Sequence, residues 1–183
     1  MPLAQRREQV LDATIRIIAR DGYDAVSIDA IARECGVTRP VVYSAYDGLG
    51  PLLHALLDRS QARAMTAIAD ILADPQGPDF VTVATRRLIE TVRADPDIWR
   101  PILGLTENSP REVRDRVEGD RAWIRQQIAA LLSDVDDPEL TAHLVVAALE
   151  HVGRLALAGD HATDRLVSAV QGLLRGVWVS PRS

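Results

Sequence analysis

Apolar residues recur every three or four positions along most of the chain, which is the spacing of one face of an α-helix. In the first such segment Val10, Thr14, Ile17 and Ile18 share a face, and the segment ends near Gly22. No segment shows the strict alternation of a half-buried strand. The pattern therefore predicts an all-α fold, which glycine and proline divide into about nine helices.

Two short helices joined by a glycine turn follow the first segment. Ser27 is a good N-cap, because its hydroxyl can accept a bond from a free N–H of the first turn. Gly36 follows the last turn, where a left-handed backbone favours a residue without Cβ. Thr38 is predicted to cap the next helix, which has Pro40 in its first turn. This arrangement is typical of a helix-turn-helix, whose second helix enters the major groove of DNA.

Further helices follow, separated by proline and glycine. The fourth carries four leucines between residues 52 and 57 and ends before a predicted linker at 74–78. In the next segment the predicted buried face is Phe80, Val81, Ala84, Leu88 and Val92. An acidic turn is predicted at 134–138. The helices expected after the linker span residues 80–94, 96–103, 109–131, 139–158 and 163–179.

The ordered motifs from Arg7 to Leu57 resemble the DNA-binding domain of the TetR family of transcriptional regulators. The matching run is Asp21-Gly22-Tyr23, Val26-Ser27-Ile28 with Ile31-Ala32, Cys35-Gly36-Val37-Thr38, Tyr43 with Tyr46, and Leu52-Leu53. The resemblance covers about the first third of the chain. It implies a helix-turn-helix DNA-binding domain over residues 1–50 and a helical effector-binding and dimerisation domain over residues 51–183.

The resemblance also implies which residues contact DNA. Arg39 is placed to read a base, and its guanidinium could bond to O6 and N7 of guanine, although a phosphate-facing or solvent-facing arginine is the alternative. Tyr43 is similar to a family tyrosine that meets phosphate, or it only packs. Arg6 and Arg7 form either an arm that reaches DNA or a frayed terminus. The predicted DNA-binding residues are Arg6, Arg7, Ser27, Thr38, Arg39, Pro40, Val41, Tyr43 and Ser44.

Two positions depart from the family pattern. Leu49 stands three residues after Tyr46, where the family usually has a phosphate-binding lysine, and Ala45 replaces the usual histidine. A leucine cannot neutralise phosphate charge. The backbone N–H groups of Gly48 and Gly50, near the start of the fourth helix, are the expected substitute.

The charge of the chain is unevenly divided. The net charge is −5, yet residues 1–63 contain eight arginines and eight carboxylates, so that the predicted reading region is neutral. Strong nonspecific binding to DNA depends on excess positive charge. We therefore expect modest affinity that depends on a few well-placed arginines.

The composition excludes several kinds of chemistry. All 21 basic residues are arginine, which excludes a Schiff-base or phosphate-loop lysine. Cys35 is the only cysteine, so an internal disulfide and a cysteine-based zinc site are impossible. The four histidines lack metal-binding spacing, and no catalytic motif occurs. We expect no enzyme activity, no cofactor and no metal. A hydrophobic leader and a long apolar run are also missing, which favours a cytoplasmic protein without membrane contact.

The last two predicted helices are unusually apolar. Residues 144–149 are apolar throughout, and Gly172 and Gly176 lie one turn apart near Leu173. This pattern fits either the core of a monomer or the face of a homodimer. We favour the dimer, because two reading heads need a two-fold axis to meet a palindromic operator.

The expected function is a ligand-responsive transcriptional regulator, a repressor, that a small and largely apolar effector releases from double-stranded operator DNA. Trp99, Leu103, Trp123 and His143 are the candidate lining of the effector cavity. One alternative is a regulator that senses nothing and whose C-terminal domain only dimerises or binds a protein partner. Another is a degenerate head that has lost DNA binding.

Overall fold

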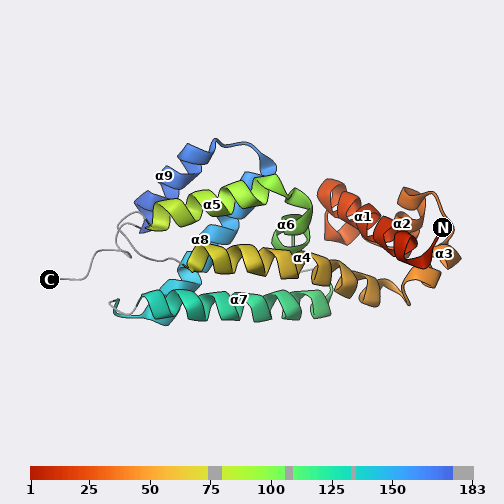
Figure 1. Ribbon diagram of the computed structural model, residues 1–183, viewed down its shortest axis with the longest axis horizontal. Helices are drawn as coiled ribbons and strands as arrows, with labels where there is room; N and C mark the ends of the chain where they lie inside the picture. Colours follow the sequence, from red (N-terminus) through yellow and green to blue (C-terminus); the bar gives the residue numbers. More distant parts are fainter. Residues whose placement is uncertain (74–79, 106–108, 133–134, 175–183) are drawn as a thin grey trace. The chain divides into compact units, whose positions relative to one another are not determined.

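The computed structural model describes residues 1–73, 80–105, 109–132 and 135–174, and this part of the chain contains nine α-helices, one 3₁₀ turn and no strand (Figure 1). The prediction of an all-α fold is confirmed. The predicted linker at 74–78 lies outside the described residues, as do residue 134 and residues 175–179. The helices are α1 Leu3–Asp21, α2 Ile28–Cys35, α3 Arg39–Ala45, α4 Leu49–Leu72, α5 Phe80–Ala94, α6 Pro96–Leu103, α7 Arg111–Leu131, α8 Pro138–Ala158 and α9 Thr163–Leu174.

Local signals in the sequence fix the limits of α2. The hydroxyl of Ser27 accepts a hydrogen bond from the backbone N–H of Ala30 at 3.1 Å. Gly36 has a φ of 66° and ends the helix in the left-handed region. Its N–H and that of Val37 bond back to carbonyls of the last turn. A residue with a Cβ would be strained at Gly36, so the short turn before α3 depends on glycine.

The start of α3 corrects one prediction. Thr38 occupies the N-cap position, but its side chain makes no capping hydrogen bond. Its backbone carbonyl instead accepts the first helical bonds, from Val41 and Val42. Pro40 lies in the first turn, where its missing N–H removes no helical bond. The Thr38 hydroxyl is therefore left exposed beside the surface of α3.

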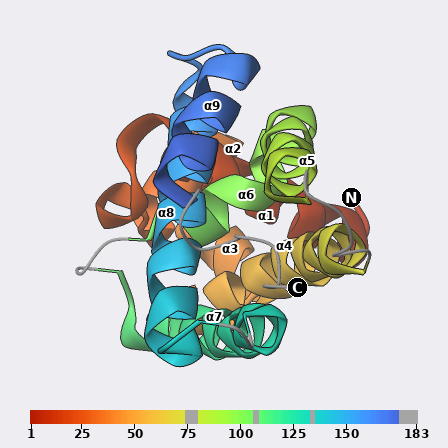
Figure 2. The ribbon, with the colours of Figure 1, turned by 90° about the vertical axis from the view of Figure 1, so that its left-hand side faces the viewer.

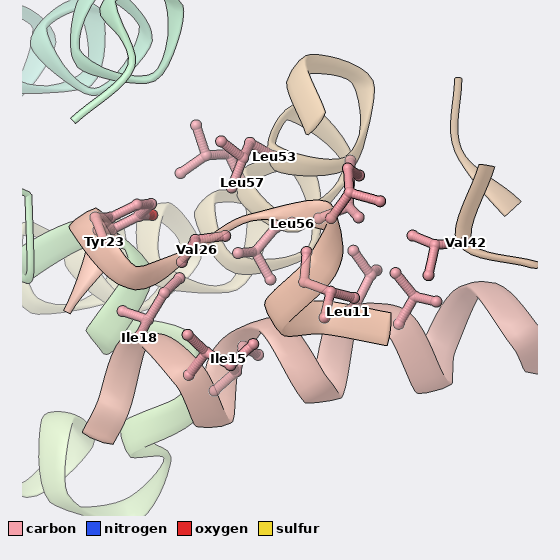
Figure 3. Packing of buried hydrophobic residues seen from close by; sticks show 14 of the residues in the cluster. Leu11, Ile15, Ile18, Tyr23, Val26, Val42, Leu53, Leu56 and Leu57 are labelled. Carbon is pink, nitrogen blue, oxygen red and sulfur yellow. The ribbon is translucent and has the colours of Figure 1, made fainter. Parts of the chain in front are cut away.

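The chain forms two compact units, and the first unites two separated segments, Met1–Arg63 and Asp97–Val117. Its core joins side chains of α1, α3 and α4, among them Leu11, Val42 and Leu56 (Figure 3). Val113 and Val117 of α7 belong to the same core. The predicted division at residue 50 remains a prediction, since it concerns function rather than packing.

Tyr23 ties the beginning of the first unit to its second segment. Its side chain is buried beside Ile18 and Val26, and its hydroxyl donates a hydrogen bond of 2.7 Å to the carbonyl of Pro101 in α6 (Figure 3). Carbonyls in the last turn of a helix have no partner within the helix, so Tyr23 satisfies one of those of α6. Burial raises the pKa of Tyr23, and the hydroxyl stays protonated as a donor.

The second unit comprises Ala64–Pro96 and residues from Glu118 onward. Within it α5 packs against both α8 and α9 (Figure 2). Phe80, Thr85, Ile89 and Val92 form the buried face of α5. The sequence pattern correctly predicted that Phe80 and Val92 are buried. It also predicted burial of Leu88, which is only half-buried, and missed the buried Ile89. By length and composition α8 could cross a membrane, with a mean hydropathy of 1.3, although buried core helices share that composition.

Candidate nucleic-acid interface

The short helix α3 has one buried face and one open face. Val42 and Ala45 are buried in the core of the first unit. Arg39, Pro40 and Ser44 are exposed, and 46% of Tyr43 is accessible. A helix that reads DNA must be anchored on one side and present side chains on the other. The structure thus gathers six predicted contacts on or beside α3, of which Val41 is half-buried and the other five are exposed: Thr38, Arg39, Pro40, Tyr43 and Ser44.

Two hydroxyls of the candidate interface are already engaged within the protein. Ser44 donates a hydrogen bond of 2.7 Å to the carbonyl of Val41, which is half-buried. Ser27 accepts the capping bond of α2 and keeps its proton for another acceptor. The Thr38 hydroxyl makes no capping hydrogen bond. It is the best placed of the three to bind a phosphate oxygen.

Arg39 is not free in the structure. Its Nε lies 3.3 Å from Oδ1 of Asp29, in the first turn of α2. Both side chains are more than half exposed, so the pair lies on the open surface rather than in the core. The sequence did not reveal this contact, because Asp29 looked like an ordinary acidic residue at the start of a helix. The turn at Gly36 brings the two first turns together.

The structure contradicts the predicted arm or frayed terminus. Helix α1 begins at Leu3, so Arg6 and Arg7 lie in its first turns. Arg6 bonds to the amide oxygen of Gln9 at 2.6 Å. Arg7 donates from Nε to the carbonyl of Ala45 at 3.0 Å and stacks over the ring of Tyr46. Arg7 therefore holds the C-terminus of α3, where a cation also complements the helix dipole.

The start of α4 explains the leucine that replaces the usual lysine. Leu49 is half-buried and packs against the core of the first unit. Gly48, with a φ of 100°, turns the chain into α4. Gly50 is exposed, and a Cβ there would meet no neighbouring atom. The N–H of Gly48 already donates to the carbonyl of Tyr46 at 2.8 Å, which corrects the prediction that it binds phosphate. The open space beside Gly50 at the helix start still suits an approaching phosphate.

Most other charges near the N-terminus are paired with one another. Glu34 accepts from Arg16 at 2.9 Å and from Arg20 at 3.2 Å, and these bonds lower the pKa of its carboxyl group. Arg59 bridges Glu8 and Asp12. The neutral charge of residues 1–63 is thus distributed as local pairs. Little positive potential is left for nonspecific attraction to DNA.

The four candidate effector-binding residues are divided between the two units. Trp99 and Leu103 are buried in the first unit. Trp123 and His143 are exposed on helices of the second unit. Helical periodicity does not tell which of the two units an element joins, and an effector site at these residues stays a prediction.

A pocket of about 500 Å³ lies in the second unit, where the turn between α8 and α9 meets α5. Arg93 of α5 crosses this region and bonds to the carbonyls of Ala156 and His161 and to the hydroxyl of Thr163. The sequence prediction missed it, because its lining comes from separate elements. The lining residues are Val92, Arg93, Pro96, Ala156, Leu157, Gly159, Asp160, His161 and Ala162. Among the described residues, no group of three metal-binding side chains occurs.

Comparison with known proteins agrees with the geometry of α2 and α3. The sequence model of the family described as "Bacterial regulatory proteins, tetR family" matches residues 10–56. An uncharacterized HTH-type transcriptional regulator of Mycobacterium tuberculosis is 31% identical over 60% of this chain and 47% of its own length. The chain thus spans about half the length of that relative.

Two further proteins resemble nearly the whole chain. An HTH-type transcriptional repressor of M. tuberculosis is 28% identical over 86% of each chain. The crystal structure of a TetR-like transcriptional regulator from Rhodococcus sp. RHA1 superposes with a TM-score of 0.78 at 25% identity, covering 96% of this chain and 97% of that one. The likeness therefore extends well beyond the helix-turn-helix. The matched helix-turn-helix and the likeness over nearly the whole chain together support assignment to the TetR family of bacterial regulatory proteins.

Proposed function

We propose that the protein is a transcriptional repressor that binds a palindromic operator as a homodimer and releases it when a small effector binds. The observation that carries the proposal is the open face of α3, anchored by Val42 and Ala45 and presenting Arg39, Pro40 and Tyr43. The match to the TetR-family model and the likeness to a transcriptional repressor support the regulatory role. The protein acts in the cytoplasm, where its DNA is.

The proposed dimer uses α8 and α9 of two copies of the chain. These helices leave large leucines in solvent: Leu144 is 65% exposed and Leu173 is 67% exposed. Leu140 is also exposed on α8. A single chain gains nothing from such side chains, whereas a second copy would bury them. A two-fold axis also gives the two α3 helices the symmetry of a palindrome.

The pocket beside Arg93 supports the sensing part of the proposal. Its lining combines the apolar Val92, Pro96 and Leu157 with the charged Arg93 and Asp160. An apolar effector with one polar group would match this lining. Release of the operator requires that the effector bind one conformation of the dimer more tightly than the other. A regulator that senses nothing would leave this pocket without a ligand.

An electrophoretic shift with the DNA upstream of the gene tests the proposal. Wild-type protein should retard this DNA at concentrations that leave random DNA free, and Arg39→Ala should weaken the shift. Arg16→Ala is the matched control, because it removes the same charge from α1, where Arg16 is paired with Glu34 of α2. Absence of a specific shift, together with binding of random DNA no better than that of unrelated proteins, would establish a degenerate head.

The direction of regulation needs a second measurement. A reporter gene behind the same DNA should be expressed less when wild-type protein is present, and Arg39→Ala should restore its expression. An increase with the wild-type protein would show an activator instead.

A further inference from the structure

The contact between Asp29 and Arg39 has a geometry that matters for reading DNA. Asp29 approaches Arg39 at Nε, the nitrogen on the side of the guanidinium. The two terminal nitrogens are then left for another acceptor pair. These are the donors with which an arginine meets O6 and N7 of guanine end-on. The ion pair draws the Nε side of the guanidinium toward Asp29 and leaves the donors that the base requires.

Both partners stand on fixed elements of the same unit. Asp29 lies in the first turn of α2, which Ser27 caps and Ile28 anchors in the core. Arg39 begins α3, which Val42 anchors. The backbone that carries the Asp29 carboxylate and the Arg39 guanidinium is therefore helical at both positions. An arginine held in this way loses less side-chain freedom when it binds a base.

The pair contributes little to folding, because both side chains are more than half exposed. The negative charge of Asp29 nevertheless affects the binding of DNA. A carboxylate beside the groove repels phosphate, and this cost falls on every DNA sequence alike. Only a DNA sequence that places a guanine against Arg39 gains hydrogen bonds from the guanidinium, and these bonds offset the repulsion.

We propose that Asp29 is a positioning residue for base recognition: it orients Arg39 toward one guanine in each half-site and disfavours DNA that lacks that guanine. The inference rests on the proposed function, since it requires that α3 enter the major groove. It assigns specificity to a residue of α2, the helix that does not itself enter the groove.

The test is selection of bound sequences from randomised DNA, carried out with five full-length proteins. Wild type and Arg39→Ala together identify the position that Arg39 reads. Asp29→Ala should lower the preference for guanine at that position by about fivefold per half-site, the upper range for an exposed ion pair. The same variant should bind random DNA more tightly than wild type. Thermal unfolding should be unchanged, which confirms that the variant is folded.

Asp24→Ala is the matched control, because it removes one exposed carboxylate near α2 without touching Arg39. It should leave the guanine preference as in wild type. In the Arg39→Ala background, Asp29→Ala should change that preference no further.

The outcomes separate the two proposals. If the selected base depends on Arg39 but not on Asp29, or if Asp24→Ala acts as strongly as Asp29→Ala, the positioning role is wrong and the proposed function stands. If Arg39 reads a base other than guanine, the positioning role is also wrong. If wild type selects no sequence, the proposed function fails and the role of Asp29 fails with it.

Discussion

Leu49 shows how one residue can serve the core at the expense of a surface contact. Its side chain packs against the core of the first unit at the point where α4 begins. A cation at this position would instead reach outward from the helix start. The adjacent Gly50 is exposed, and a Cβ there would meet no neighbouring atom. In the proposed complex with DNA, a phosphate at this point would meet backbone groups rather than a side-chain charge.

Leu49→Lys should therefore add one phosphate contact per head and two per dimer. Counterion release predicts that the slope of log affinity against log salt steepens by about 1.8, equally on operator and random DNA. Leu49→Gln, which loses the same packing without gaining a charge, is the control. An unchanged slope for Leu49→Lys would show that this position does not approach the DNA backbone.

Cys35 has no sign of a reactive thiol. Its side chain is half-buried against the core, and its Sγ lies 3.8 Å from the carbonyl of Gln9. Burial raises the pKa of the thiol, which keeps it protonated and poorly nucleophilic. The residue packs between α1 and the turn that precedes α3.

At the scale of elements, the two short helices begin in similar sequences but in different ways. Ser27 and Thr38 both occupy N-cap positions, yet only Ser27 makes the side-chain bond. Ser27→Ala should lower the free energy of unfolding by about 1 kcal/mol, and Thr38→Ala by much less. Chemical denaturation of both variants measures the difference. Equal losses would mean that Thr38 also caps its helix in solution.

Tyr23 joins elements that lie far apart in the sequence. Tyr23→Phe would leave the carbonyl of Pro101 buried without a partner, which should cost about 1–3 kcal/mol of stability. Tyr43→Phe is the control, because the Tyr43 side chain is exposed on α3 rather than buried. Calorimetry should show a lower melting temperature for Tyr23→Phe alone. A stable Tyr23→Phe variant would mean that water replaces the lost donor.

The helix limits near the N-terminus were predictable because they depend on local chemistry. Ser27, Gly36 and Pro40 act on backbone groups within four residues, and the structure places all three as predicted. The partners of Tyr23 and Arg39 were not predictable, since no local signal specifies contacts between elements. The buried face of α5 was displaced by one residue for a similar reason. Leu88 and Ile89 are both apolar, and only the packing of α8 and α9 chooses between them.

At the scale of the whole molecule, the exposed leucines of α8 and α9 are the feature of a single chain that indicates assembly. Leu173 is exposed in the single chain, so Leu173→Arg should leave the monomer folded. In the proposed dimer the same change buries an unpaired charge, which should produce monomers with poor operator binding. Sedimentation at micromolar concentration distinguishes the two states. Val83→Arg, at an exposed apolar position of α5, should remain dimeric.

If Leu173→Arg sediments as a dimer, α9 is not part of the interface. If the wild type is a monomer, the proposed dimer is wrong altogether. The position next to Leu173 gives a useful contrast, because Leu174 is buried within the chain. Leu174→Arg should unfold the second unit rather than separate subunits.

The first unit is assembled from two stretches of chain, and this affects how such regulators can be recombined. A reading head cut after Arg63 would leave behind Val113 and Val117, which complete its core, and Pro101, which pairs with Tyr23. A chimera that joins this head to a foreign body therefore needs residues 97–117 as well as residues 1–63. Where only the first stretch is exchanged, the recipient's own helices must fit the leucines of α4. A single crossover after Arg63 would leave the core of the first unit incomplete.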